Sequence, residues 1–207
     1  MSTMAQDQIT EINEAVGQRW RNIDPLLPEP GGIKGGCGTP LVAPGQDGRP
    51  TGLAVCRHQH VRADELAQTW DAVTKYALTM RLGEADTLAA VDDLLTQWRD
   101  HLANLPEAPE ATDDDTSATV AWPARDVTGV LALQRHGLQP LTVIAVRRAT
   151  TPVPKHGDHH DLVIRHAGPA DLDKVIELEL GVIHYDAHFG AAVPAPGHAR
   201  ARPRGHP

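Results

Sequence analysis

The chain has 207 residues, enough for one full domain and a remainder, and its formal net charge is -8. That acidic balance gives no overall attraction to nucleic acid or to an anionic membrane surface. The first residues lack the charged, apolar and small-residue succession of a signal peptide, and no apolar run is long enough to cross a bilayer, so we expect a cytoplasmic protein.

The cysteines and tryptophans are expected to be structural. In a cytoplasmic chain Cys37 and Cys56 should both be reduced, and a catalytic role for either needs a histidine placed by the fold, whereas His58 is only a neighbour in sequence. The tryptophans are expected in the core and at its edge, and not as stacking platforms: Trp20, Trp70, Trp98 and Trp122.

Hydrophobic spacing predicts the elements of the first half of the chain. They are a helix at 7–20, a β-hairpin of 41–43 and 53–56 around Asp47-Gly48, a short helix at 62–73, a strand at 75–82, and a long helix from Glu84 to Leu105. The strand alternates, with Tyr76, Leu78 and Met80 on one face. The acidic residues 106–115 then form a solvated connection.

The residue pattern of 116–147 predicts three further elements. Residues 116–122 form a strand, 127–137 a helix with Asp126 as N-cap and Gly137 as C-cap, and 141–147 a buried strand. This order predicts an α/β fold of the mixed kind, with a central sheet and helices on both of its faces.

After a polar linker the pattern begins again. Residues 161–165 form a short strand, and Pro169 starts a helix. The apolar face of that helix consists of Leu172, Val175, Ile176, Leu180 and Ile183. A lone strand and helix bury too little surface to stand alone, so we expect them to dock on the first domain or on a partner.

Two stretches resemble the GNAT acetyltransferase family, specifically bacterial proteins that carry two such domains in tandem. VAWPARDVTGVLALQRHGLQPLTVIAVR is similar to the family's closing strand, helix and strand, and VIRHAGPADLDKVIELELGVIHYDAHFG resembles its opening strand and first helix. The resemblance implies a degenerate GNAT-like domain at 1–148 and the beginning of a truncated second GNAT domain at 161–190. Prolines, a glycine and polar residues make 149–160 a linker, and the tail at 191–207 has almost no large apolar residue, so we expect it to be disordered.

The resemblance also implies acetyl-CoA as acetyl donor, an amine as acceptor, and a pyrophosphate held by backbone N–H groups where the central helix begins. The family's pattern there falls on residues 81–86, so Arg81, Gly83 and Ala85 are the candidate cofactor-binding residues. Gly83 comes one position early, and Glu84 and Asp86 bring carboxylates that stabilise a helix start but repel a pyrophosphate. We therefore favour a structural helix start over a working phosphate cradle.

The sequence selects no catalytic residue and no metal site. The family's acid is usually a tyrosine on the late helix, which here has none, and His136 at the end of that helix is an alternative donor. Candidate bases are Asp64, Glu65 and Asp71, with nothing to choose between them. The histidines and aspartates of 156–161 are metal-ligand types, but they lie in a linker without fixed spacing.

Three functions stay open. The chain is an acetyl-CoA-dependent N-acetyltransferase acting on a small-molecule or peptide amine, a non-catalytic GNAT-like regulatory or structural module, or an inactive truncated tandem acetyltransferase. In a complete relative, the polar residues after the second-domain helix would face the acceptor: His184, Tyr185, Asp186 and His188. No nucleic-acid or membrane partner is predicted, and a homodimer is compatible with the sequence.

Overall fold

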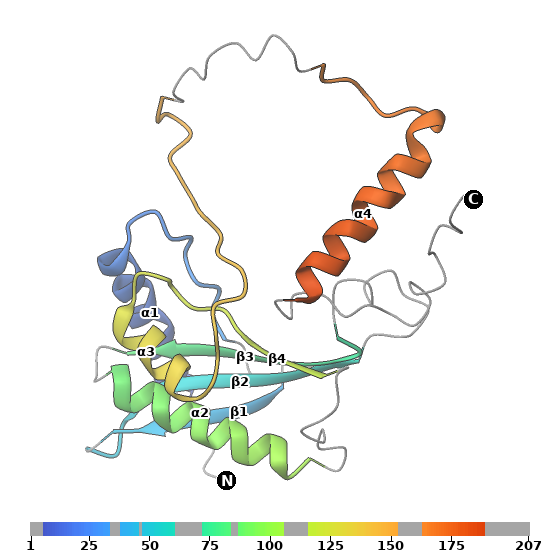
Figure 1. Ribbon diagram of the computed structural model, residues 1–207. Helices are drawn as coiled ribbons and strands as arrows, with labels where there is room; N and C mark the ends of the chain where they lie inside the picture. Colours follow the sequence, from blue (N-terminus) through green and yellow to red (C-terminus); the bar gives the residue numbers. More distant parts are fainter. Residues whose placement is uncertain are drawn as a thin grey trace.

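A four-stranded mixed sheet forms the centre of the molecule in the computed structural model, which describes residues 6–33, 38–45, 47–60, 72–83, 87–105, 116–152 and 163–188 (Figure 1). The strands, in spatial order, are β1 (Thr39–Pro44), β2 (Pro50–His60), β3 (Thr74–Leu82) and β4 (Thr116–Val120). β1–β2 and β2–β3 are antiparallel, and β3–β4 is parallel. The predicted hairpin, the predicted strands at 75–82 and 116–122, and the mixed sheet are confirmed.

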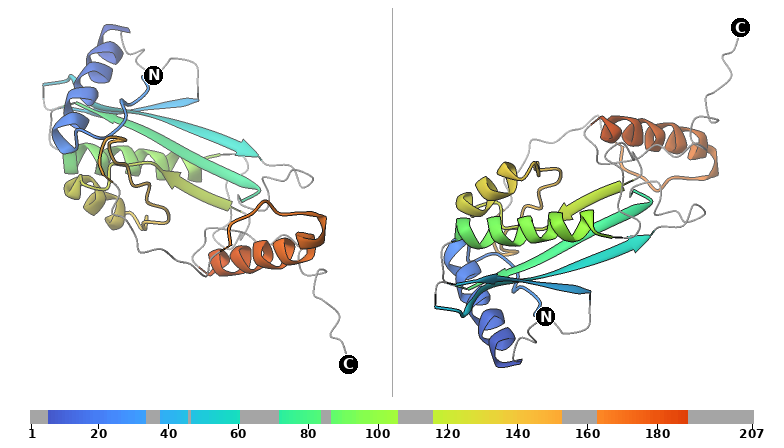
Figure 2. Two further views of the ribbon diagram at one scale, coloured as in Figure 1. Left: turned by 90° about the horizontal axis from the view of Figure 1, so that it is seen from above. Right: turned by 90° about the horizontal axis from the view of Figure 1, so that it is seen from below.

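Helices cover both faces of this sheet, as predicted. They are α1 (Gln6–Ile23), α2 (Thr87–Ala103) and α3 (Val127–Arg135); a fourth helix, α4 (Leu172–Ala187), follows a short 3₁₀ turn at Pro169–Asp171. α1 lies on one face, and α2 and α3 lie on the other side, as the views from above and below show (Figure 2). The four predicted helices at 7–20, 84–105, 127–137 and after Pro169 are confirmed.

Several predictions fall outside the described residues. The short helix at 62–73 lies almost wholly in 61–71, the acidic connection is 106–115, most of the linker lies in 153–162, and the tail lies beyond 188.

The main core lies between the sheet and α2. Period-two alternation sends Tyr76, Leu78, Met80 and Leu82 of β3 to the α2 side, where they are almost fully buried. The side of α2 that meets them carries Ala90, Val91, Leu94, Leu95 and Trp98, all buried. The helically spaced apolar residues of α2 therefore pack against the alternating apolar residues of β3, as the sequence predicted.

Helix α3 is closed at both ends by backbone capping. The carboxylate of Asp126 accepts a hydrogen bond from the N–H of Gly129 at 3.3 Å, as expected of an N-cap. At the other end Gly137 has a φ of 83°, and the N–H of Leu138 donates to the carbonyl of Leu133 at 3.0 Å. This is the Schellman arrangement, so both predicted caps are confirmed.

The strands predicted at 141–147 and 161–165 are wrong for every residue described. Residues 141–147 and 163–165 are in no strand and pair with none of the described strands; Ile144 is 85% exposed and Ile164 is 96% exposed. An apolar, β-branched composition indicates that burying a segment is favourable. It does not identify the strand that would pair with the segment or the layer that would cover it. The apolar face expected on α4 is likewise mostly exposed, although Ile183 is buried.

Among the described residues, no helix combines the length and the apolar character needed to span a lipid bilayer.

Two helical glycines provide a matched test of the packing of α3. A methyl group on Gly129 would lie 2.2 Å from Nε1 of the Trp122 ring, whereas one on Gly181 of α4 meets no described residue within 4 Å. We expect Gly129→Ala to destabilise the domain by about 1–3 kcal/mol, despite the better helix propensity of alanine. Gly181→Ala should instead stabilise α4 by up to about 1 kcal/mol.

Urea unfolding of both variants, with helicity followed by circular dichroism, measures the two effects. If both substitutions were stabilising, Trp122 would not be seated against α3 as described.

Candidate functional site

The carboxyl ends of the parallel strands form the candidate site, because β3 continues beyond its last partner in β4. The β3–β4 ladder ends where Leu78 pairs with Val120, whereas β3 stays paired with β2 as far as Leu82. Thr79–Leu82 therefore has no partner on the β4 side among the described strands. α2 begins at Thr87, directly after this end of β3. Ligands of open α/β sheets bind outside the carboxyl ends of the strands, so this opening is the candidate binding site.

Arg81, the first predicted cofactor residue, lies at this end of β3 but is engaged within the fold. Its guanidinium donates to the carbonyl of Gly31 from Nε at 3.1 Å and from Nη2 at 2.6 Å, and Nη1 donates to the carbonyl of Met80 at 2.8 Å. The guanidinium carbon lies 5.6 Å from the ring centroid of Trp20. Burial lowers the pKa of Arg81. The side chain thus holds the segment after α1 against the sheet.

Gly83, the second predicted residue, has a backbone donor that is also in use. Its N–H donates to the carbonyl of Thr51 on β2 at 2.9 Å, which extends the pairing with β2 by one residue. Within the described part of the chain, a methyl group added at Gly83 would contact only that carbonyl, at an ordinary 3.5 Å, so these residues leave room for a side chain. Ala85, the third residue, lies outside the described residues, together with Glu84 and Asp86.

A pyrophosphate cradle built on Arg81 and Gly83 does not fit these contacts. The donors that would hold the phosphates already bind carbonyl groups of the protein, and breaking those bonds leaves the carbonyls of Gly31 and Thr51 without these donors.

An ion pair that the sequence did not reveal closes the same end of the molecule. Arg19 of α1 binds Asp126, the N-cap of α3; the arginine side chain is 16% exposed and the aspartate 7%. Beside it Arg125 pairs with Asp24 at 3.2 Å. Both pairs join the end of α1 to the connection between β4 and α3. The sequence marked Asp126 only as a cap, because no pattern links residues so far apart.

His136, the proposed alternative acid, is part of the contact between α2 and α3. Its Nε2 lies 3.2 Å from Oδ1 of Asp92, and its backbone N–H binds the carbonyls at the end of α3. The ring is only 16% exposed. These contacts assign His136 to helix packing and capping. Candidate bases Asp64, Glu65 and Asp71 lie outside the described residues.

Cys56 is a buried packing residue. Trp98 of α2 donates from Nε1 to its Sγ at 3.1 Å, and burial raises the pKa of the thiol. A raised pKa suppresses the thiolate, which is the nucleophilic form. His58 stacks on Tyr76 at a centroid distance of 4.9 Å. Cys37 and the histidine cluster of 156–161 are outside the described residues, and within the described residues no three metal-ligating side chains come together.

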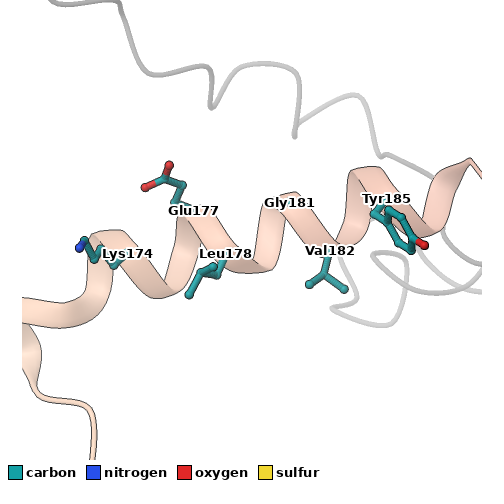
Figure 3. Close-up of a pocket in the computed structure, with 6 residues that line it drawn as sticks. All are labelled: Lys174, Glu177, Leu178, Gly181, Val182 and Tyr185. Carbon is teal, nitrogen blue, oxygen red and sulfur yellow. The ribbon is translucent and has the colours of Figure 1, made fainter. Parts of the chain in front are cut away.

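A shallow hollow lies along α4, where Leu178 and Val182 point to the same side of the helix (Figure 3). It is lined by Lys174, Glu177, Leu178, Gly181, Val182 and Tyr185. Nδ1 of His184 and Nδ1 of His188 each donate to the carbonyl one turn earlier in the chain, at 2.8 and 3.0 Å. Among the described residues, every lining residue comes from this one helix, so no second described element brings converging polar groups to the hollow.

The start of α4 is fixed by an exposed ion pair. Arg165 donates to both carboxylate oxygens of Asp171 at 2.7 Å, and the N–H of Gly168 donates to the same carboxylate at 2.8 Å. These bonds lower the pKa of Asp171 to about 2, the bond from Arg165 having the larger effect.

Comparison of the sequence with protein-family models, with curated proteins and with solved structures finds no match.

The buried ion pair between Arg19 and Asp126 should be far more important for stability than the neighbouring pair between Arg125 and Asp24, whose arginine is exposed. Asp126→Asn keeps a capping oxygen but removes the charge that faces Arg19, and we expect a loss of about 3 kcal/mol in the free energy of unfolding. Asp24→Asn removes the partner of Arg125, whose side chain is 73% exposed, and should cost about 1 kcal/mol or less.

Chemical denaturation of the two variants measures this difference. Equal small losses would mean that α1 is not tied to α3 through Asp126.

The pair at the start of α4 predicts a specific pH dependence. Because the pKa of Asp171 is lowered from 3.8 to about 2 in the folded chain, its contribution to the helix start is present above 3.8 and is lost as the pH falls through about 2. Arg165→Gln should raise this pKa toward 3.8. Carboxyl-carbon NMR titration follows Asp171 directly, and Arg148→Gln, which removes an exposed arginine elsewhere, should leave the titration unchanged. An Asp171 midpoint near 3.8 in the unaltered chain would contradict the pairing.

Proposed function

We propose that the chain is a GNAT-like N-acetyltransferase, a protein that transfers the acetyl group of acetyl-CoA to an amine. The two stretches that resemble the family, 120–147 and 163–190, support this assignment. The acceptor is a small-molecule or peptide amine, and acetyl-CoA is the cosubstrate.

The observation that carries the proposal is the early end of the β3–β4 ladder. β4 stops pairing at Leu78, and β3 runs on to Leu82 just before α2 begins. The edge of β3 beyond Leu78 and the beginning of α2 therefore lie at one end of the sheet. The positive end of a helix favours an anion such as a pyrophosphate, and open strand edges bind extended ligands through main-chain hydrogen bonds.

A second candidate function is a non-catalytic GNAT-like module that supports or regulates a catalytic domain. The observation in its favour is that Arg81 and Gly83 use their donors within the fold. Glu84 and Asp86 also add negative charge to the same turn, and α3 contains no tyrosine. Such a module would retain the sheet but would not bind the coenzyme.

Isothermal titration of the whole chain with acetyl-CoA separates the two candidates. The acetyltransferase proposal predicts micromolar binding, weakened at least about tenfold by Gly83→Glu, because the substitution puts a further carboxylate beside the start of α2. The described residues leave room for a side chain at Gly83, so the variant should stay folded. Gly181→Glu makes the same change of charge in α4, where no described residue lies within 4 Å of an added Cβ, and should leave binding unaltered.

The absence of heat at millimolar acetyl-CoA would contradict the acetyltransferase proposal. A thiol-release assay with a panel of amines adds a second readout: binding without release of free coenzyme A would favour the non-catalytic module.

A further inference from the structure

Two exposed histidines lie one helical turn apart at the end of α4. His184 belongs to the last turn of the helix, and His188 is its C-cap. The backbone of His188 keeps helical dihedral angles, with φ -63° and ψ -24°, so the helical spacing continues through this residue. Residues four positions apart share one face of a helix, with their Cβ atoms about 5–6 Å apart. The two imidazole rings are therefore neighbours on the surface of the helix.

The hydrogen bonds of these rings determine which nitrogen is available to a ligand. Nδ1 of His184 lies 2.8 Å from the carbonyl oxygen of Leu180, and Nδ1 of His188 lies 3.0 Å from the carbonyl oxygen of His184. A carbonyl oxygen only accepts, so Nδ1 carries the hydrogen in both rings, and Nε2 of a neutral ring keeps its lone pair. Within the described part of the chain, neither Nε2 takes part in a hydrogen bond or an ion pair.

This arrangement is the one that metal-binding histidines have in proteins. A histidine ligand almost always donates its second ring N–H to a carbonyl or carboxylate oxygen, which orients the ring and makes the binding nitrogen more basic. Two histidines at positions i and i+4 of a helix are a known spacing for Zn²⁺ ligands. The carboxyl end of a helix also carries partial negative charge, which favours a cation. Tautomer, spacing and helix dipole thus agree.

The two rings need to move only slightly to share one ion. Equivalent atoms one turn apart are separated by about 5.4 Å along a helix, whereas two nitrogens bound to one tetrahedral Zn²⁺ lie roughly 3.4 Å apart. Each ring therefore has to lean toward the other by about 1 Å, and both side chains are exposed, which permits that movement. No third ligand-type side chain joins the pair among the described residues, so water would complete the coordination.

We propose that His184 and His188 form a two-histidine site for a divalent transition-metal ion, which binds through Nε2 of each ring. Zn²⁺, Ni²⁺ and Cu²⁺ all suit imidazole ligands, and Cu²⁺ should bind most tightly of the three. The bound ion links the last turn of α4 to its C-cap and so stabilises the end of the helix. Binding of the ion does not require acetyl-CoA, so the metal site and the proposed transfer of an acetyl group are tested separately.

NMR titration of the whole chain with Zn²⁺ tests the site, because it separates these two rings from the other histidines of the chain. We expect the Nε2 signals of His184 and His188 to shift together, with a single affinity. His184→Ala should weaken binding at His188 at least about tenfold, because the ion loses the second bond of the chelate. His166→Ala removes an exposed histidine that precedes α4 and should leave the affinity unchanged.

A rearranged pair tests the spacing. The double variant Asp186→His with His188→Ala keeps two histidines but places them two positions apart, where side chains do not face each other on a helix. It should bind Zn²⁺ as weakly as His184→Ala does. Circular dichroism, recorded with and without Zn²⁺, should show a gain of helicity in the unaltered chain that both variants lack.

Four results would overturn the two-histidine site. They are the absence of any shift of the two Nε2 signals at millimolar Zn²⁺, separate titration of the two rings, unchanged affinity in His184→Ala, and undiminished affinity in the rearranged pair. Separate titration would mean that each histidine binds an adventitious ion by itself.

Discussion

Helix α2 packs its buried side over the alternating face of β3, and this contact determines the course of the parallel strand that follows. A parallel pair needs a crossover, and α2 is that crossover. Its 17 residues span about 25 Å, close to the length of the nine-residue β3. Leu94 and Val91 are fully buried at this contact, so α2 cannot slide without exposing them. The position of β4, and hence the opening beyond Leu78, follows from this packing.

The opening and its surroundings have different implications for function. The course of β3, α2 and β4 provides a strand edge and a helix start at one end of the sheet. The side chain of Arg81 and the amide of Gly83, however, hold the protein's own carbonyl groups at the same end. Arg19 and Asp126 add a buried ion pair that ties α1 to α3 there. Contacts within the protein thus occupy polar groups at the end of the sheet where a ligand would bind. For this reason both a catalytic and a non-catalytic function are proposed.

Local patterns in the sequence predicted the elements whose signals are short in range. Alternation in β3, the helical period of α2 and the caps Asp126 and Gly137 all depend on neighbours within a few residues, and all are confirmed. The engagement of Arg81 with Gly31 and the pair between Arg19 and Asp126 join residues far apart in the chain, which no period reports. The strand predicted at 141–147 was wrong for a related reason. Its composition indicates that burial is favourable but does not identify the strand that would pair with it.

The central claim is that β3 loses its β4 partner after Leu78, and hydrogen exchange along β3 measured by NMR tests it most directly. Amides of β3 alternate between the β2 side and the β4 side. The structure predicts slow exchange on both sides from Thr74 to Leu78, and fast exchange on the β4 side alone from Thr79 to Leu82. Slow exchange on both sides as far as Leu82 would mean a closed sheet, and the proposed site would not exist.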